Sequence, residues 1–195
     1  MILVAVGANL PAGSGTTPLA TCRQAVEALR LIPGLRVAAV SRWYETDPVP
    51  PSGQPPYVNG VVRLAGRIDP AALLHALHAI EDGHGRRRGE RNAARTLDLD
   101  VIAMDDPDTA SDDGALVRTA PDPVVPHPRT HLRGFVLEPL RDVAPGWRHP
   151  VLHESAETLL AGLPPQGVRR IGEEAGEVEA PPQAPPKASL WNPLA

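Results

Sequence analysis

Apolar residues along this chain follow two periods in turn, an alternating one and a helical one. Apolar or alternating runs bounded by Gly and Pro are typical of strands, and we expect strands at residues 1–8, 36–45, 57–65, 97–104 and 167–172. Apolar residues three and four positions apart are typical of helices, which we expect to begin at residues 18 and 70 and to cover 129–142 and 155–163. Because several connections are too short for a crossover, the pattern predicts a layered α+β domain with a largely antiparallel sheet.

The first two helices carry the same start signal. Thr17-Pro18 and Asp69-Pro70 each place a capping side chain before a proline at the first helical position, where the missing N–H has no partner to lose. The third helical segment, 129–142, contains Pro139. A proline in a helix interior removes a hydrogen bond, so we expect this helix to bend or split there.

One domain and a separate tail account for the 195 residues. We expect residues 1–172 to form a single domain, because a chain of this size buries its own core. Residues 173–195 are rich in Glu, Pro and Ala, which bury little apolar surface, so they predict a disordered tail. Residues 83–95, with several glycines and arginines, predict a mobile loop, and residues 105–122 predict an excursion with little structure.

The strand at 97–104 contains the chain's most informative chemistry. Asp98 and Asp100 stand two positions apart in an otherwise apolar run, and side chains two apart on a strand share one face. They are separated by about 6.5–7 Å along the strand, within reach of a pair of metal ions. Two unpaired carboxylates would repel each other, so a cation is expected between them. The arginines of 86–95 suit phosphate oxygens, and together these features indicate phosphoryl-transfer chemistry.

Charge and composition exclude several function classes. The net charge of −4, with basic residues gathered locally, argues against a nucleic-acid partner. Lys187 is the only lysine and lies in the proline-rich tail, so the chain has no Walker-type phosphate loop. Cys22 is the only cysteine, which excludes an internal disulfide and indicates a reducing compartment. No apolar run approaches the ~20 residues of a membrane helix, so we expect a cytoplasmic protein without membrane contact, with Cys22 in the core.

A series of motifs covers roughly residues 1–165. They are Val4–Leu10, Ser41–Thr46, Gln54–Asn59, Ile80-Glu81, Gly85–Arg88, Arg95–Asp100, Val125–Arg129 and Arg133–Leu140. The Asp-x-Asp block and the Pro-His-Pro-Arg block are highly specific in combination. Together, and in this order, the motifs resemble those of the 6-hydroxymethyl-7,8-dihydropterin pyrophosphokinase family.

The resemblance implies a fold, a reaction and a set of ligands. The fold is a ferredoxin-like α+β sandwich. The reaction transfers an intact diphosphate from ATP to the pterin hydroxymethyl oxygen and releases AMP, with two Mg²⁺ ions as cofactors. The implied partners are therefore small molecules, ATP and the dihydropterin.

The resemblance also implies a role for each matching residue. The metal ligands are Asp98 and Asp100, and the catalytic arginines are Arg86, Arg88 and Arg95. The residues expected to contact ATP are Glu81, Arg95, His127, Arg129 and Arg133. The residues expected to bind the pterin are Thr46, Val49, Tyr57, Asn59 and Phe135. Tyr57 and Phe135 are the stacking aromatics of this set.

The chain departs from the family pattern at two places, and two alternatives stay open. Asn92 stands where the arginine loop often has a tryptophan, and Asp47 follows Thr46 where proline is frequent. Another metal-dependent transferase that uses Asp-x-Asp, a nucleotidyl or glycosyl transferase, would release diphosphate or a nucleoside diphosphate instead of AMP. A non-catalytic nucleotide- or pterin-binding module would need a broken carboxylate pair or missing arginines, and the sequence shows neither.

Overall fold

A six-stranded sheet forms the centre of the computed structural model, which describes residues 1–13, 15–48, 53–86, 94–108 and 114–172. The strands are β1 (Ile2–Ala8), β2 (Leu35–Val40), β3 (Tyr44–Thr46), β4 (Tyr57–Gly66), β5 (Asp98–Met104) and β6 (Arg169–Arg170). Their order is β5-β1-β4-β3-β6, and β2 also pairs with β4. Each of these pairs is antiparallel, which confirms the predicted sheet.

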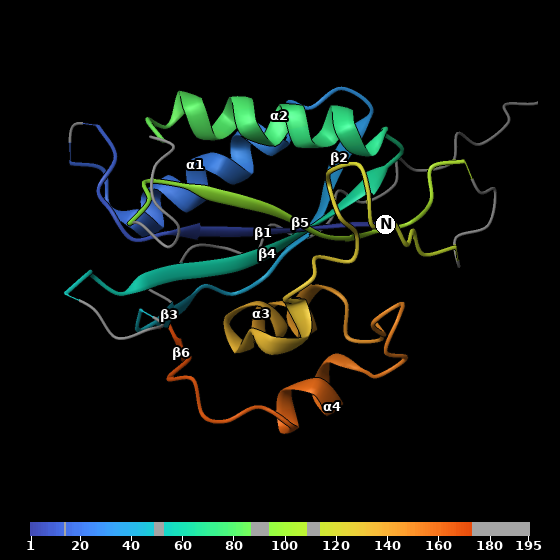
Figure 1. Ribbon diagram of the computed structural model, residues 1–195. Helices are drawn as coiled ribbons and strands as arrows, with labels where there is room; N and C mark the ends of the chain where they lie inside the picture. Colours follow the sequence, from blue (N-terminus) through green and yellow to red (C-terminus); the bar gives the residue numbers. More distant parts are fainter. Residues whose placement is uncertain (14, 49–52, 87–93, 109–113, 173–195) are drawn as a thin grey trace, which may run out of the picture.

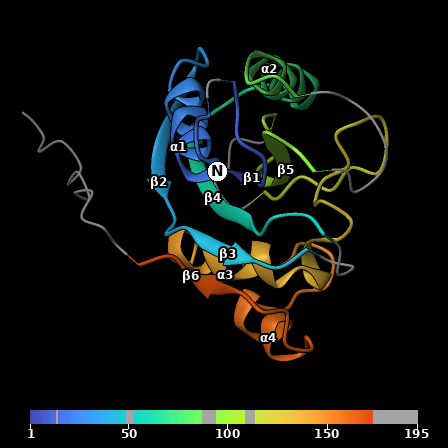
Figure 2. The same cartoon turned by 90° about the vertical axis from the view of Figure 1, so that its left-hand side faces the viewer.

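Helices cover both faces of this sheet (Figure 1). The helices are α1 (Pro18–Leu29), α2 (Pro70–Gly83), α3 (Gly134–Val143) and α4 (Ala156–Ala161), with a 3-10 turn at Thr130–Leu132. α1 and α2 lie on one face, and α3 and α4 lie on the other (Figure 2). The result is the expected α+β sandwich, with the sheet as its middle layer.

The predicted helix starts are confirmed by their hydrogen bonds. The Thr17 hydroxyl accepts the N–H of Ala20 at 3.2 Å. One Asp69 carboxylate oxygen accepts the N–H groups of Ala71 and Ala72 at 2.9 and 3.0 Å. These oxygens satisfy donors that the first turn of a helix leaves without a partner.

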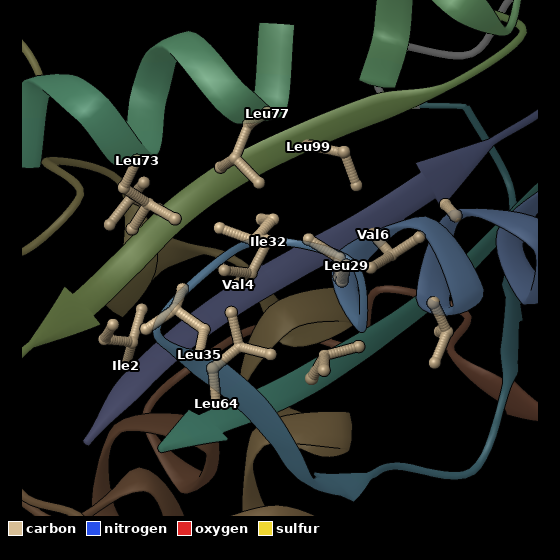
Figure 3. Close-up of a cluster of buried hydrophobic side chains, with 14 of the residues drawn as sticks. Ile2, Val4, Val6, Leu29, Ile32, Leu35, Leu64, Leu73, Leu77 and Leu99 are labelled. Atoms are coloured by element: carbon tan, nitrogen blue, oxygen red, sulfur yellow. The ribbon is translucent and has the colours of Figure 1, made fainter. Parts of the chain in front are cut away.

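Alternation along β1 divides its side chains between two cores. Ile2, Val4, Val6 and Ala8 pack with α1 and α2, in the cluster that includes Leu73, Leu77 and Leu99 (Figure 3). Leu3 points to the opposite core, which it shares with side chains of α3 and α4. Cys22 belongs to the first core, and burial raises the pKa of its thiol to about 12. Its expected place in the core is therefore confirmed.

The expected strand 36–45 is two strands rather than one. β2 ends at Val40 and β3 begins at Tyr44. The Ser41 hydroxyl accepts the N–H of Val61 at 2.9 Å, so a side chain takes the place of a ladder carbonyl at the break. Trp43 crosses β4 at Gly60, where a Cβ would lie only 2.6 Å from the indole. Gly60 is therefore required for the chain to turn between β2 and β3 at this point.

The helical segment 129–142 divides at Arg133, not at Pro139. Arg133 has an extended backbone, with φ −117° and ψ 98°, between the 3-10 turn and α3. Pro139 lies inside α3, which continues to Val143. Burial of the proline ring offsets part of the cost of the hydrogen bond that its nitrogen cannot make. The extended conformation of Arg133 sends its side chain towards β5.

The remaining segments agree in part with expectation. The predicted strand 167–172 is the two-residue β6, and the predicted helix 155–163 is α4. Within 105–122, the described parts form only isolated bridges, Asp105 with Ala115 and Arg118 with Val125. The tail 173–195 lies outside the described residues. In the part of the chain that is described, no helix has the length and apolarity to cross a membrane.

His149 is a buried histidine, and we expect it to make the stability of the fold depend on pH. Its ring is buried, and Nδ1 accepts the N–H groups of Val151 and Leu152, each at 3.2 Å. Burial lowers the pKa of His149, and the neighbouring His131 and His153 lower it further. As the pH falls, the unfolded chain therefore takes up this proton before the folded chain does.

We expect the free energy of unfolding to decrease as the pH falls below the unfolded pKa of about 6.5, and this contribution to be complete above it. His149→Asn is a matched control, because its side-chain oxygen can accept the same two N–H groups and does not titrate. Urea unfolding at about pH 7.5 and about pH 5.5 should show a smaller loss in the variant than in the original chain. Equal losses in the two proteins would contradict this role for His149.

Candidate active site

Asp98 and Asp100 lie on one face of β5, at the N-terminal end of the strand. Their β1 neighbours across the ladder are Gly7, which has no side chain, and Ala5, which has only a methyl group. Leu99, between them, packs into the opposite core. The side chains of Asp98 and Asp100 are 26% and 36% exposed, so both carboxylates can reach a ligand. The predicted shared face is therefore present.

Arginine side chains meet the charge of Asp98. Arg86 Nη1 lies 2.8 Å from Asp98 Oδ1, and Arg95 Nη1 lies 2.6 Å from Asp98 Oδ2. Arg86 follows α2, which ends at Gly83, and Arg95 precedes β5. Two guanidinium groups therefore meet the charge of Asp98, and the cation expected between the two carboxylates stays a prediction.

Asp100 has different neighbours, which come from the segment before α3. Arg133 Nη1 lies 3.5 Å from Asp100 Oδ2, and His127 Nε2 lies 3.8 Å from the same oxygen. Both contacts are longer than those of Asp98, so Asp100 is the less completely paired carboxylate. Burial and the neighbouring Arg129 lower the pKa of Arg133, although Asp100 acts to raise it. Arg133 remains charged, since its ordinary pKa lies above 12, and an anionic ligand would stabilise it.

Burial and hydrogen bonds fix the position of His127 and favour its neutral form. Its backbone N–H donates to Ile102 at 2.9 Å, which fixes the residue next to β5, and its Nδ1 accepts the N–H of Arg129 at 3.2 Å. Burial lowers the pKa of His127; Asp100 opposes this, and Arg133 and Arg129 add to it. A neutral imidazole can offer Nε2–H to an oxygen of a ligand.

Glu81 of α2 contacts β5 at Leu99, the residue between the two carboxylates. It is completely buried, and Oε1 accepts the N–H of Leu99 at 2.7 Å and also pairs with Arg86. Oε2 has no hydrogen-bond partner among the described residues. Arg86 therefore bridges a buried carboxylate of α2 and a partly exposed carboxylate of β5. The direct ATP contact expected of Glu81 stays a prediction, and in this structure its side chain holds Arg86 and β5 instead.

Three of the residues expected to bind the pterin lie where β3 ends and β4 begins, and a fourth, Phe135, lies at the start of α3. Asn59 Nδ2 donates to Thr46 Oγ1 at 2.9 Å, and both side chains are buried. Tyr57 is half-buried, and its hydroxyl donates to Gln54 at 2.9 Å. Phe135, in the first turn of α3, lies under Arg133, whose Cζ is 5.5 Å from the ring centroid. Arg133 therefore connects the pterin residues with the carboxylates.

Two expected site residues lie outside the described part of the chain. They are Val49 and Arg88. Arg88 belongs to the gap at 87–93, which also contains Asn92, Arg87 and Arg91. The structure therefore brings together twelve of the expected residues from five separate parts of the chain: Thr46, Tyr57 and Asn59; Glu81 and Arg86; Arg95, Asp98 and Asp100; His127 and Arg129; and Arg133 and Phe135.

Asn9 belongs to the site although the sequence assigned it no separate role. It is completely buried at the end of β1. Its Oδ1 accepts the N–H of Arg95 at 2.8 Å, and its backbone N–H donates to the Arg95 carbonyl at 3.0 Å. Its Nδ2 donates to Gln54, the partner of Tyr57, at 3.2 Å. Asn9 thus joins an arginine of the carboxylate group to the pterin residues, and its position just after Gly7 in a motif was the signal for it.

The carboxylate pair fits a magnesium site of the kind that shares its ion with a substrate. No group of three or more His, Cys, Asp or Glu side chains that could hold a metal occurs among the described residues. Mg²⁺ is commonly held by one or two carboxylates, together with phosphate oxygens and water, rather than by a cage of protein ligands. Asp98 and Asp100 supply two such carboxylates, and the surrounding arginines supply donors for phosphate oxygens.

Comparisons with known proteins agree with this arrangement. The family described as 7,8-dihydro-6-hydroxymethylpterin-pyrophosphokinase (HPPK) matches residues 3–145. A 2-amino-4-hydroxy-6-hydroxymethyldihydropteridine pyrophosphokinase of Pseudomonas aeruginosa is 38% identical over 170 residues, which cover 87% of this chain and 96% of that protein. The protein of the same name from Synechocystis is 37% identical over 155 residues, covering 79% of this chain and 73% of that one.

A solved structure gives independent support for the fold. A triple mutant of Plasmodium falciparum HPPK-DHPS superposes with a TM-score of 0.54 at 13% identity, over 82% of this chain and 43% of that one. At this identity the likeness concerns the fold alone. The family match covers both strand carboxylates, both partly exposed arginines of Asp98 and the His127–Phe135 segment. This chain belongs to the 7,8-dihydro-6-hydroxymethylpterin-pyrophosphokinase family.

Proposed function

We propose that this chain transfers the terminal diphosphate of ATP to the hydroxymethyl oxygen of 6-hydroxymethyl-7,8-dihydropterin, as a Mg²⁺-dependent step of folate biosynthesis that releases AMP. The observation that carries the proposal is the convergence of Asp98, Asp100, Arg86, Arg95 and Arg133 on one end of β5, inside the region that the family matches. Its substrates are small molecules, with no nucleic acid or membrane involved.

The carboxylates hold the metal in this proposal. Asp98 and Asp100 would hold the two Mg²⁺ ions of this proposal, and the metal charge would offset the negative charge that develops on the phosphate during transfer. Asp100 is the more open of the two, with 3.5 Å to its closest cationic partner. For Asp98 to hold a metal, its contacts with Arg86 and Arg95 must loosen, and the two guanidinium groups then become free to turn to phosphate oxygens.

The cationic side chains bind and orient the triphosphate. Arg95 contacts Asp98 and Arg133 contacts Asp100, and Arg129 adjoins Arg133 closely enough to lower its pKa. His127 adds a neutral N–H donor. Arg86, together with Arg88 of the loop outside the described residues, is proposed to act on the transferring group. Fixed hydrogen-bond donors of this kind stabilise the charge of a phosphoryl-transfer transition state. Positioning and electrostatics account for most of the catalysis in such reactions, so the chain needs no side chain that reacts covalently.

The pterin occupies the other half of the site. Phe135 and Tyr57 stack on its ring, while Thr46, Asn59 and the backbone near Val49 bind its polar edge. The Asn59–Thr46 hydrogen bond of 2.9 Å fixes the orientation of both side chains. Because Arg133 lies over Phe135, the stacked ring is placed beside the phosphate-binding residues, which brings its hydroxymethyl group close to ATP.

The proposed step is a single displacement at the β-phosphorus. The hydroxymethyl oxygen forms a bond to the β-phosphorus, and the bond from that phosphorus to the oxygen shared with the α-phosphate breaks. The bridging oxygen leaves on AMP, and the hydroxyl proton is released to solvent. Holding the two substrates in line accounts for a large part of the rate, because effective molarities reach about 10⁵ M or more in well-oriented systems.

Detection of AMP is the direct test of this function. The purified chain is incubated with ATP, Mg²⁺ and 6-hydroxymethyl-7,8-dihydropterin, and AMP is measured against a pterin that lacks the hydroxyl. We expect AMP only with the hydroxylated pterin and only when Mg²⁺ is present. Release of diphosphate or of a nucleoside diphosphate in place of AMP would point to a different Asp-x-Asp transferase. Tight binding of both substrates without turnover would point to a binding module.

Phe135 provides a separate test of the pterin half. We expect Phe135→Ala to weaken pterin binding by about 2 kcal/mol, because stacking and apolar burial are both lost. Phe135→Leu is the matched control, since it keeps much of the apolar area and removes only the ring. Calorimetric titration should place the leucine variant between the other two proteins. If alanine leaves pterin affinity unchanged, Phe135 is not part of the pterin site.

A further inference from the structure

The segment that follows α4, residues 163–171, crosses the molecule as a strap from α4 to the sheet edge. It runs past α3 and ends at β6, which pairs with β3 (Figure 2). The strap begins beyond residue 145, where the family match ends, and none of its residues has a role in the function proposed above. Two of its side chains contact residues next to the proposed substrate site. Gln166 bonds to the backbone on either side of Arg133, and Arg169 pairs with the acidic residues on either side of Thr46.

Gln166 holds the backbone on both sides of Arg133. Its Oε1 accepts the N–H of Gly134 at 2.7 Å, and its Nε2 donates to the carbonyl of Leu132 at 3.0 Å. One side chain therefore fixes the groups that immediately precede and follow Arg133 in the chain.

The start of α3 depends on this contact. Arg133 occupies the N-cap position of α3, and its side chain makes no capping hydrogen bond. The first turn of a helix leaves N–H groups without partners, and Gln166 satisfies the N–H of Gly134 from 32 positions away in sequence. Glycine at 134 permits the approach, since a Cβ there would lie 3.1 Å from Gln166 Oε1 and 3.5 Å from Val168.

The same strap also holds the strand that contains Thr46. Arg169 pairs with Asp47 at 3.0 Å and with Glu45 at 3.1 Å, the two residues on either side of Thr46. These ion pairs are exposed and individually weak. The half-buried Gln166, which bonds to backbone, is therefore the stronger of the two connections between the strap and the site.

We propose that Gln166 is a positioning residue for substrate binding, which acts by fixing the backbone of Arg133. With that backbone held, the guanidinium lies between Asp100, at 3.5 Å, and the Phe135 ring, at 5.5 Å. Without Gln166, the Arg133 backbone keeps only its bonds to Thr130, Val136 and Leu137. The groups on either side of it, Leu132 C=O and Gly134 N–H, then lose their side-chain partner, and the guanidinium is held less firmly. This role rests on the proposed function of the site.

The test is a double-mutant cycle of Gln166 and Arg133 that measures the KM for ATP. We expect Gln166→Ala to raise the KM for ATP about tenfold, with a smaller effect on kcat, since it removes two hydrogen bonds that order one arginine. In an Arg133→Ala background, the same change should raise the KM for ATP by less than about twofold, because the group that Gln166 positions is already gone. Gln24→Ala, on the exposed face of α1, is the matched control and should leave all constants unchanged. Equal factors in the two backgrounds would overturn the proposal.

A second measurement separates this inference from the proposed reaction. Amide hydrogen exchange of Gly134 should speed up about tenfold or more in Gln166→Ala while core strands stay protected. Gln166→Glu keeps the acceptor for Gly134 but cannot donate to Leu132, so its exchange at Gly134 should stay close to that of the original chain while its KM for ATP rises. Failure of the original chain to form AMP would contradict the proposed function. Unchanged exchange at Gly134 in Gln166→Ala would overturn the positioning role of Gln166, whether or not AMP is formed.

Discussion

Replacing Asp98 or Asp100 with asparagine is expected to lower the rate of AMP formation by about 10³-fold or more, because each variant removes a charged oxygen from the proposed metal site. Asparagine has nearly the size and shape of aspartate, so the packing of β5 should be retained. The loss should appear mainly in kcat at saturating Mg²⁺, and raising the Mg²⁺ concentration should restore little of it. Steady-state kinetics over a range of Mg²⁺ concentrations measures both effects.

The structure also predicts how these variants change stability. Two unpaired carboxylates would repel, and removing one would then stabilise the fold. In this structure, however, Asp98 is paired with Arg86 and Arg95, so Asp98→Asn should lower the free energy of unfolding, by about 1 kcal/mol for partly exposed pairs. Asp100, with its longer contacts, should change stability less.

Asp82→Asn is a matched control for both aspartate variants, since Asp82 is an exposed aspartate of α2. It should leave AMP formation and unfolding unchanged. Activity near the original level in either strand variant would remove the metal role from that residue. A loss of activity that follows global unfolding in thermal melts would likewise leave the metal assignment without support.

Replacing Arg86 with alanine is expected to have the second large effect, on activity and on stability together. An arginine that stabilises a phosphoryl-transfer transition state is worth on the order of 10³-fold, and Arg88 shares the proposed role, so we expect kcat to fall about 10²–10³-fold. The affinity for ATP measured by calorimetry should change much less. Arg23→Ala, an exposed arginine of α1, is the control and should behave like the original chain.

The stability effect of Arg86→Ala follows from Glu81. Glu81 is fully buried, and Arg86 is its cationic partner. Removing one partner of a buried ion pair leaves an uncompensated charge, which costs about 3 kcal/mol of unfolding free energy. In the double variant Arg86→Ala with Glu81→Gln, the neutral side chain still accepts the N–H of Leu99, so most of this stability should return.

The double variant separates the two roles of Arg86. Chemical unfolding should show recovered stability, while AMP formation should stay as low as in Arg86→Ala alone. If activity returns together with stability, Arg86 acts only as the counter-charge of Glu81 and has no part in the reaction. If neither kcat nor stability changes in Arg86→Ala, both assignments are wrong.

Local patterns predicted the elements well, for identifiable reasons. Thr17-Pro18 and Asp69-Pro70 determine helix starts through hydrogen bonds that span only two or three residues, so neighbouring sequence contains all the information needed. Alternation in 97–104 likewise determined that Asp98 and Asp100 share a face, since a pleated strand fixes side-chain direction by itself. The family motifs then supplied the roles of the residues along the chain.

Two breaks in the elements could not be read from the sequence. The strand 36–45 divides because Ser41 bonds to Val61 and Trp43 crosses Gly60, and both partners belong to β4. The helix 129–142 divides at Arg133 rather than Pro139, where Gln166 holds the backbone from the far end of the chain. In both cases a residue distant in sequence overrides the local preference.

The sequence by itself determined the helix caps and the shared face of Asp98 and Asp100, because each depends on spacing within one element, and its short connections indicated the α+β class. Only the tertiary structure decided which cations meet these carboxylates, that Glu81 is buried and contacts β5 at Leu99, and that Asn9 and Gln166 fix Arg95 and Arg133. The physical reason is the strand order β5-β1-β4-β3-β6. It brings segments separated by tens of residues to one end of β5, and no local period records which segments will meet there.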